Sequence, residues 1–257
     1  MPRRASPPTV AVIPAAGHAT RLTRQGALAC SKEILPVPGL DGGPPRPVCL
    51  HLLESLAQAG IRRTFLVLRQ GKEDIPHTLG SGAKLGFDPG LDLAYLWVED
   101  SQSVPETLDR AWNHIRGQRV LLGFPDALFE PRDAFVHLLE DHEFSGADLV
   151  LGLFPADRPH TTEMVMVDGA GTITGLEIRP AQTDLTYNWL LALWNSRFTA
   201  FLHTQVAHHR RQRQARDPEK IPEFQLGQLF QRALAAGFRV RGVPFPEGRY
   251  VDIGSPE

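Results

Sequence analysis

The stretch from Val10 to Pro36 constrains the fold of this chain more than any other. It begins with Val10-Ala11-Val12-Ile13, a run of small or β-branched apolar residues bounded by proline and glycine. Such a run is typical of a buried strand. The segment that follows, Pro14 to Thr20, is poor in bulky side chains and leads directly to Arg21. We therefore predict a buried strand that ends in a loop with a closely approachable backbone.

The loop after this strand is suited to binding phosphate. Consecutive backbone N–H groups can cradle phosphate oxygens, and the planar guanidinium of Arg21 matches a phosphate group. A second cation, Lys32, follows in Ser31-Lys32-Glu33-Ile34-Leu35-Pro36. Taken alone, the loop is also compatible with an ordinary tight turn, because it matches neither GxxxxGK[ST] nor GxGxxG.

Strands and helices alternate through the first half of the chain. A helix expected over 49–60 lies between the first strand and a second strand at 64–68, and this strand–helix–strand order implies a parallel sheet. The second half changes character, because two strand patterns flank Gly169-Ala170-Gly171, which indicates a hairpin. Further strands are expected at 93–98, 119–124, 147–154, 187–194 and 238–243, and further helices at 105–116, 131–144, from 196, and at 224–236.

Four motifs together resemble one enzyme family. IPAAGHATRL followed by SKEILPV, then GFPDALF at 123–129 and YVDIGSPE at 250–257, stand in the order found in the sugar-nucleotide pyrophosphorylases, which are nucleotidyltransferases. The resemblance implies an α/β fold with a Rossmann-like, mixed but mostly parallel sheet and helices on both faces. It also implies one domain over 1–257, with a disordered lead-in at 1–8, a nucleotide-binding half at about 9–155 and a sugar-phosphate-binding half at about 156–257.

The same resemblance implies a reaction and a site. NMP would pass from a nucleoside triphosphate to a sugar 1-phosphate, with release of pyrophosphate. Arg21 and Lys32 are the expected catalytic residues, and Asp126 and Asp252 the expected ligands of Mg²⁺, which prefers oxygen ligands. The expected nucleotide contacts are Ala15, Ala16, Gly17, His18, Ala19, Thr20, Gln102 and Thr107. The expected sugar-phosphate contacts are Glu177, Arg179 and Asn188.

Several of these assignments have an ordinary structural alternative. Gln102 and Thr107 also fit a common strand-to-helix loop with proline at the helix start, and Asn188 also fits a polar residue at a strand entrance. Glu177 stands two residues before the cation rather than next to it, so strand alternation could point its side chain to the opposite face. Without the family match, Asp126 is more typical of a turn or helix cap.

Three departures from the family pattern keep other functions open. Ala19, Glu106 and Met164 stand where the family usually has glycine. One alternative is therefore a catalytically degenerate protein that binds a nucleotide or sugar nucleotide for regulation. Another is a nucleotidyltransferase whose acceptor is a non-sugar phosphate such as phosphocholine. Retention of the four charged residues Arg21, Lys32, Asp126 and Asp252 favours catalysis.

Two other patterns have ordinary interpretations. The basic run at 208–216 lacks interleaved aromatic residues, so we expect a solvated helix end and no nucleic-acid partner. The His137-to-His142 segment does not have the HxxEH spacing of a zinc site.

The composition is typical of a globular protein, and we expect a cytoplasmic location. The chain has 257 residues, of which 42% are hydrophobic, which is enough for a sizeable core, and a net charge of −2. No apolar run approaches the roughly 18 residues that a membrane span requires, so no membrane partner is expected. Its two cysteines suggest a reducing compartment. The sequence does not determine the base of the nucleotide or the identity of the acceptor. A homo-oligomer is possible.

Overall fold

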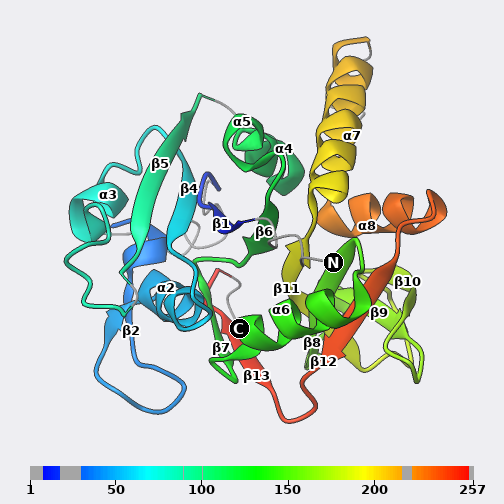
Figure 1. Cartoon of the computed structure of the whole chain (residues 1–257), viewed down its shortest axis with the longest axis horizontal. Helices are drawn as coiled ribbons and strands as arrows, with labels where there is room; N and C mark the ends of the chain where they lie inside the picture. The colour runs from blue at the N-terminus through cyan, green and yellow to red at the C-terminus, as the bar shows by residue number, and fades with distance from the viewer. Residues whose placement is uncertain (1–7, 18–29, 89, 100, 216–221, 255–257) are drawn as a thin grey trace, which may run out of the picture.

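The computed structural model describes residues 8–17, 30–88, 90–99, 101–215 and 222–254. Within these residues, nine strands form a mixed central sheet whose main path runs β10-β9-β11-β6-β1-β4-β5, while β8 joins β11 to β12 (Figure 1). The strands are β1 (Thr9–Pro14), β4 (Arg63–Arg69), β5 (Asp92–Val98), β6 (Arg119–Leu122), β8 (Leu149–Pro155), β9 (Glu163–Val167), β10 (Ile173–Ile178), β11 (Tyr187–Trp194) and β12 (Val240–Pro244). The α/β class expected from the sequence is confirmed.

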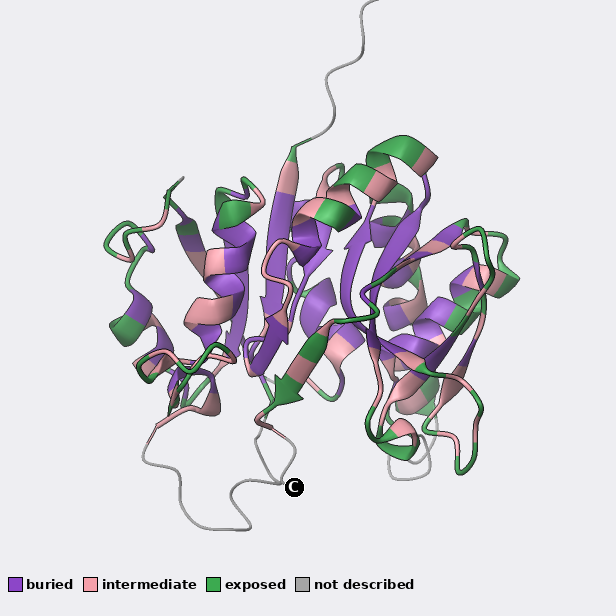
Figure 2. Cartoon of the chain, turned by 90° about the horizontal axis from the view of Figure 1, so that it is seen from below, coloured by how far each residue is buried: buried purple, intermediate pink, exposed green. Residues whose placement is uncertain are grey.

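Strand β1 lies in the middle of the sheet, which explains its apolar sequence. It pairs in parallel with β4 on one side and with β6 on the other. Because side chains alternate along a strand, Val10 and Val12 enter one hydrophobic core, whereas Ala11 and Ile13 enter the other. Figure 2 shows the sheet as a buried layer in purple. A strand that is covered on both faces needs an apolar residue at every position.

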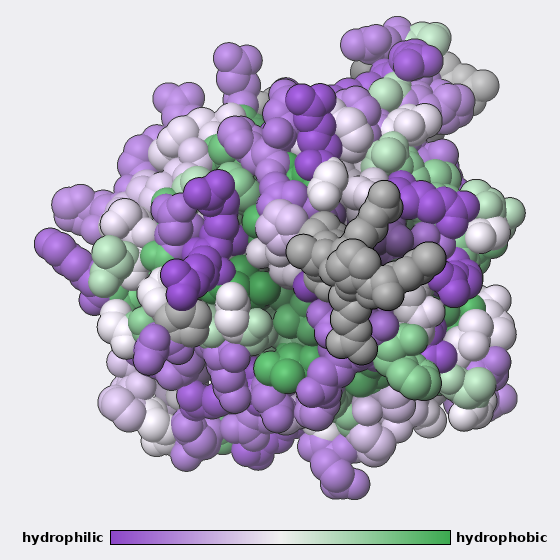
Figure 3. All heavy atoms as spheres, in the orientation of Figure 1, coloured by the Kyte–Doolittle hydropathy of each residue, from purple (hydrophilic) through white to green (hydrophobic). Residues whose placement is uncertain are grey.

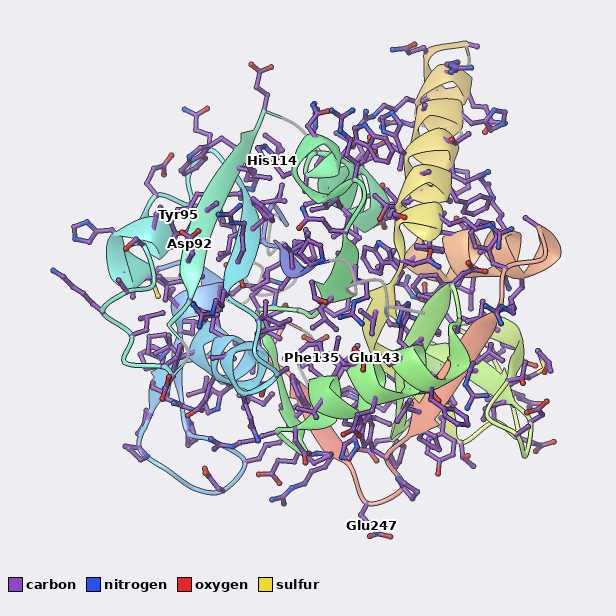
Figure 4. The ribbon with its side chains drawn as sticks, in the orientation of Figure 1. Asp92, Tyr95, His114, Phe135, Glu143 and Glu247 are labelled. Carbon is purple, nitrogen blue, oxygen red and sulfur yellow. The ribbon has the colours of Figure 1, made fainter. Side chains whose placement is uncertain are left out.

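Helices cover both faces of the sheet. The face of Val12 packs against α4 (Val104–Asp109), α5 (Trp112–Ile115), α7 (Ser196–Ala215) and α8 (Leu226–Ala235). The face of Ile13 packs against α2 (Cys49–Gln58), α3 (Asp74–Leu79) and α6 (Ala134–Ser145). In this second core, Phe135 of α6, labelled in Figure 4, is fully buried. Its ring meets that of Phe129 edge-on. The expected helix at 105–116 is divided into α4 and α5.

The basic run lies on the end of α7, which projects beyond the layered body (Figure 1). This projecting end is largely hydrophilic in Figure 3, and His208 and Arg211 are exposed. However, His209 is buried, and Arg210 forms an ion pair with Asp109 of α4 at 3.4 Å. The expectation of a solvated helix end therefore holds for only one side of the helix, because the other side packs against α4.

A small sheet that the sequence analysis did not predict joins the two halves of the chain. Strands β7 (Ala127–Glu130) and β13 (Arg249–Asp252) pair in antiparallel fashion, with Ala127 opposite Asp252. The pairing places Asp252 beside the strand that starts directly after Asp126. The remaining short elements are β2 (Pro36–Val37), β3 (Arg46–Pro47) and the 3₁₀ helices η1 (Lys32–Ile34) and η2 (Pro159–Thr161).

The expected disordered lead-in falls mostly outside the described residues, which omit 1–7. Pro8 is described, and its carbonyl oxygen accepts a hydrogen bond from the backbone N–H of Arg119 at 3.1 Å, which ties it to the start of β6. None of the helices in the described part of the chain has both the length and the apolar character needed to cross a bilayer.

Candidate functional site

Two adjoining pockets lie at the carboxyl ends of the central strands, where open α/β sheets usually bind ligands. The β1 pocket, of about 320 Å³, is lined by Pro14, Ala16, Gly17, Lys32, Glu33, Ser101, Gln102, Ser103, Val104, Thr107, Phe124, Asp126 and Glu223. The β11 pocket, of about 260 Å³, is lined by Phe124, Asp126, Ala127, Thr161, Thr162, Glu163, Asn188, Trp189, Leu190, Tyr250 and Asp252. The two pockets share Phe124 and Asp126, so ligands in both would meet at this carboxylate.

The loop after β1 is only partly described. Ala16 and Gly17, two of the expected nucleotide contacts, line the β1 pocket. Ala15 does not, because it packs in the second core and its backbone N–H donates to the carbonyl oxygen of Val67 at 2.9 Å. The predicted contacts His18, Ala19 and Thr20 and the predicted catalytic Arg21 lie outside the described residues.

Lys32 and Asp126 form an ion pair where the pockets meet. The ammonium group of Lys32, on η1, donates to Oδ2 of Asp126, and both side chains are largely buried, with 18% and 13% of their surfaces exposed. Burial opposes the charge on Lys32, but the nearby carboxylates, Asp126 foremost, outweigh it and raise the pKa of Lys32. Lys32 therefore carries its positive charge at any physiological pH.

Asp126 and Asp252, the expected metal ligands, both lie next to Gly254. A Cβ atom on Gly254 would lie 2.6 Å from Oδ2 of Asp126, 3.0 Å from Nζ of Lys32 and 3.1 Å from Oδ1 of Asp252. The described residues contain no group of three or more histidine, cysteine or acidic side chains that could hold a metal by themselves. Two carboxylates nevertheless fit Mg²⁺, which usually completes its shell with water and substrate phosphates.

A second, fully buried ion pair lies next to Lys32. Glu33 lines the β1 pocket, and its Oε1 accepts a hydrogen bond from Nζ of Lys72 at 2.5 Å. Burial lowers the pKa of Lys72, although the charge of Glu33 opposes this effect. The sequence analysis missed Lys72. Its position just after β4 gave no signal, because only the fold brings it to η1.

The segment from Ser101 to Thr107 forms another wall of the β1 pocket. Gln102 and Thr107, the expected base contacts, both line it. The alternative prediction also applies, since Ser103 caps α4 and accepts a hydrogen bond from the N–H of Glu106 at 3.4 Å. Glu106 in turn accepts from the N–H of Gln102 at 3.2 Å. The Ser103-Val-Pro-Glu106 pattern resembles a capping box, a signal that the sequence analysis did not use.

The β11 pocket contains one of the three predicted sugar-phosphate residues. Asn188 lines it, and none of the described residues donates a hydrogen bond to its buried Oδ1. Glu177 does not line it but pairs with Met164 across β9 and β10. Arg179 lies beside the pocket, since its backbone N–H donates to Thr162 at 2.9 Å. Met164 is fully buried in the core, so its side chain does not fill the pocket.

Glu163 is an acidic residue of the β11 pocket that the sequence analysis missed. Its carboxylate accepts hydrogen bonds from Nε1 of Trp189 at 2.7 Å and from the backbone N–H of Gly227 at 3.0 Å. Burial raises the pKa of Glu163, although these two donors and Arg179 oppose the shift. Its place at the start of the predicted hairpin was visible in the sequence, but its contact with Trp189 depends on the pairing of β9 with β11.

Comparison with known proteins supports the fold. No protein-family model matches the chain, and no curated protein matches it. Among solved structures, similar ones include a proposed glucose-1-phosphate thymidylyltransferase from Bacillus anthracis in complex with sucrose (TM-score 0.75, 17% identity, covering 96% of this chain and 90% of that chain). A UDP-glucose pyrophosphorylase from Acinetobacter baumannii gives a TM-score of 0.74 at 16% identity, covering 96% and 89%.

A third similar structure is an inositol-1-phosphate CTP transferase from T. maritima, with a TM-score of 0.67 at 18% identity, covering 96% of this chain and 89% of that chain. All three proteins are named as nucleotidyltransferases or pyrophosphorylases, as the motifs at 13–22, 31–37, 123–129 and 250–257 predict. At these identities the similarity concerns the fold. The chain therefore has the nucleotide-diphospho-sugar transferase fold of the sugar-nucleotide nucleotidyltransferases.

Proposed function

We propose that this protein transfers NMP from a nucleoside triphosphate to a sugar 1-phosphate, forming an NDP-sugar and pyrophosphate. The observation that carries the proposal is the position of Asp126, which lines both pockets and lies beside Lys32 and Asp252. A two-substrate phosphoryl transfer needs one pocket for each reactant and a charged centre between them. The motif resemblance and the fold agree with this reaction.

The β1 pocket would hold the nucleoside triphosphate. Its phosphates would contact the backbone at Ala16 and Gly17 and the ammonium group of Lys32. Arg21, which the sequence places on the same loop, would neutralise the departing pyrophosphate. The base would lie against the wall formed by Gln102 and Thr107. Charge neutralisation of this kind supplies most of the catalysis when both reactants are polyanions.

Asp126 and Asp252 would hold Mg²⁺, which would neutralise charge on the α-phosphate and orient it for attack. Because the ammonium group of Lys32 already donates a hydrogen bond to Asp126, it would lie close to the α-phosphate as well. Gly254 leaves room for these groups because it has no side chain: a Cβ atom there would collide with Oδ2 of Asp126, at 2.6 Å, and press against Oδ1 of Asp252, at 3.1 Å.

The acceptor would enter the β11 pocket. One of its phosphate oxygens would attack the α-phosphorus, and the bond from that phosphorus to the oxygen leading to the β-phosphate would break, so that pyrophosphate leaves with the electron pair. The acceptor phosphate is already ionised near pH 7, and the step requires no general base. Arg179 would bind this phosphate from beside Thr162, while Asn188 and Glu163 would bind hydroxyl groups of the acceptor.

The test is release of pyrophosphate in the presence of Mg²⁺. ATP, CTP, GTP, UTP and dTTP would each be combined with a panel of sugar 1-phosphates, inositol 1-phosphate and phosphocholine. We expect one pair to dominate, with activity lost in Asp126→Asn and Arg21→Ala. Asp88→Asn, which changes an exposed carboxylate outside both pockets, is the matched control. Dominance of phosphocholine would leave the reaction type intact but replace the sugar acceptor.

A protein that only binds a nucleotide would give a different result. It would bind a triphosphate in calorimetry yet release no pyrophosphate with any acceptor. Activity that survives Asp126→Asn would contradict the assignment of this carboxylate as a metal ligand, even if the reaction type is right.

A further inference from the structure

His209 is a buried residue near the projecting end of α7, on the side of the helix that packs against the body of the protein. Only 6% of its surface is exposed, although its neighbour His208 is exposed and α7 extends beyond the body of the protein (Figure 1). It lies on the side of α7 that faces α4 and the segment leading into α8. The reaction proposed above does not use it.

On one side, His209 meets the wall of the β1 pocket formed by the start of α4. Its Nδ1 lies 3.7 Å from Oε1 of Glu106, and Nη1 of Arg213 lies at the same distance from that oxygen. The other oxygen of Glu106 accepts a hydrogen bond from the backbone N–H of Gln102, which lines the β1 pocket. Both Glu106 and His209 are buried, so the contact between them lies away from solvent.

On its other side, His209 meets a second wall of the same pocket. Its ring stacks on Phe224, with ring centres 5.0 Å apart and planes inclined by 21°. The guanidinium of Arg232, from α8, lies over the Phe224 ring at 4.8 Å. Phe224 is 1% exposed, and its chain neighbour Glu223 lines the β1 pocket. His209 therefore lies between the residues that anchor two walls of one pocket.

We propose that His209 is a positioning residue of the β1 pocket. By contacting Glu106 and Phe224 together, it fixes the wall at Gln102–Thr107 relative to the wall at Glu223. The spacing of the walls then sets the affinity for the nucleoside triphosphate. This inference rests on the proposed function, because it takes the β1 pocket as the nucleotide site. It also explains Glu106, which replaces a family glycine and provides the contact that His209 requires.

The test compares nucleotide binding with acceptor binding in variants of the full chain. His209→Leu removes the interaction with Glu106 and the ring stack. We expect its Kd for the preferred triphosphate of ATP, CTP, GTP, UTP and dTTP, measured by calorimetry, to rise by about tenfold. The KM for the acceptor and kcat at saturating nucleotide should stay unchanged, since neither depends on these walls. His209→Gln keeps a polar side chain facing Glu106 and should recover part of the lost affinity.

Two leucine variants provide matched controls. His208→Leu changes the exposed neighbour on the same turn. His203→Leu breaks the 2.6 Å contact between α7 and Asp109, which does not line the pocket. Both should bind the triphosphate as the wild type does. Thermal unfolding of each variant shows whether it is folded. If His209→Leu does not fold, His209→Gln takes its place: because glutamine cannot stack on Phe224, its Kd should lie above that of the wild type. A wild-type Kd in a folded His209→Gln protein would then contradict the proposal.

Several results would overturn the proposal. A folded His209→Leu protein with wild-type affinity would show that His209 does not position the pocket. An equal loss in His203→Leu would indicate a general effect of docking α7 on α4. Wild-type protein that binds none of the five triphosphates would contradict the proposed function itself, and the inference with it.

Discussion

The ammonium group of Lys72 lies 2.5 Å from Oε1 of Glu33, and both side chains are almost completely buried. Glu33 is the chain neighbour of Lys32, which forms the ion pair with Asp126 between the two pockets. Burial of two charges is costly unless they are paired. The pair therefore fixes η1, and with it the backbone that carries Lys32, relative to the segment after β4.

Replacing Lys72 by methionine should lower stability strongly. Lys72→Met leaves the Glu33 carboxylate buried without its partner, and we expect the free energy of unfolding to fall by about 3–5 kcal/mol. The double variant Lys72→Met/Glu33→Met should recover most of this loss, because no uncompensated charge remains. Urea denaturation followed by circular dichroism would measure both. A single variant as stable as the wild type would show that the pair is not structural.

Gly254→Ala should impair catalysis without unfolding the protein. The new Cβ would lie 2.6 Å from Oδ2 of Asp126, so the carboxylate must move. A displacement of about 1 Å in a catalytic group can cost about 100-fold in rate, and we expect kcat/KM to fall by that order. Gly169→Ala is the control, since its Cβ would meet nothing within 4 Å. Equal kinetics in the two variants would remove Gly254 from the site.

We expect substitutions of Glu163 and Glu177 to differ in their effect on the KM for the acceptor. Glu163→Gln removes a buried carboxylate that lines the β11 pocket, and we expect the acceptor KM to rise by about tenfold, with the nucleotide KM unchanged. Glu177→Gln should leave both constants unchanged, because Glu177 does not line the pocket. Steady-state kinetics with the acceptor found in the pyrophosphate assay would decide. A larger effect from Glu177 would favour the expectation from the family resemblance over the structure.

Asp148→Asn should lower stability in a pH-dependent way. Burial of Asp148 opposes its charge, but hydrogen bonds from the N–H of Arg239, from Asn195 and from Arg197 outweigh it and hold the pKa of Asp148 below 3.8. A carboxylate with a lowered folded-state pKa stabilises the protein above the unfolded value and loses this contribution as pH falls through the folded value.

We therefore expect Asp148→Asn to lower the free energy of unfolding by about 2 kcal/mol at pH 7. The difference from the wild type should shrink as the pH falls below 3.8. Denaturation in urea at pH 7 and at pH 3 measures both values, with Asp88→Asn as an exposed control. A difference that is the same at both pH values would show that the charge of Asp148 is not what stabilises the fold.

Local features of the fold follow from the sequence because they depend on near neighbours in the chain. The apolar run at Val10–Ile13 predicted the central strand, since a strand covered on both faces must be apolar throughout. The alternating pattern and glycine turn at 163–178 predicted the β9–β10 hairpin in the same way. The motifs around Lys32, Asp126 and Asp252 predicted which charged side chains belong to the candidate site.

The meeting of those side chains was decided by tertiary structure. Asp126 and Asp252 come together because β7 pairs with β13, a contact between distant segments that no local pattern indicates. Lys72 reaches Glu33, Glu163 reaches Trp189, and His209 reaches Glu106 for the same reason. Sequence patterns report the preferences of neighbouring residues, whereas these contacts depend on which elements pack together. The sequence by itself therefore determined the strands of the central sheet and the charged residues of the four motifs. Only the packing of the sheet and helices decided which residues share a pocket, because that packing joins segments that lie far apart in the chain.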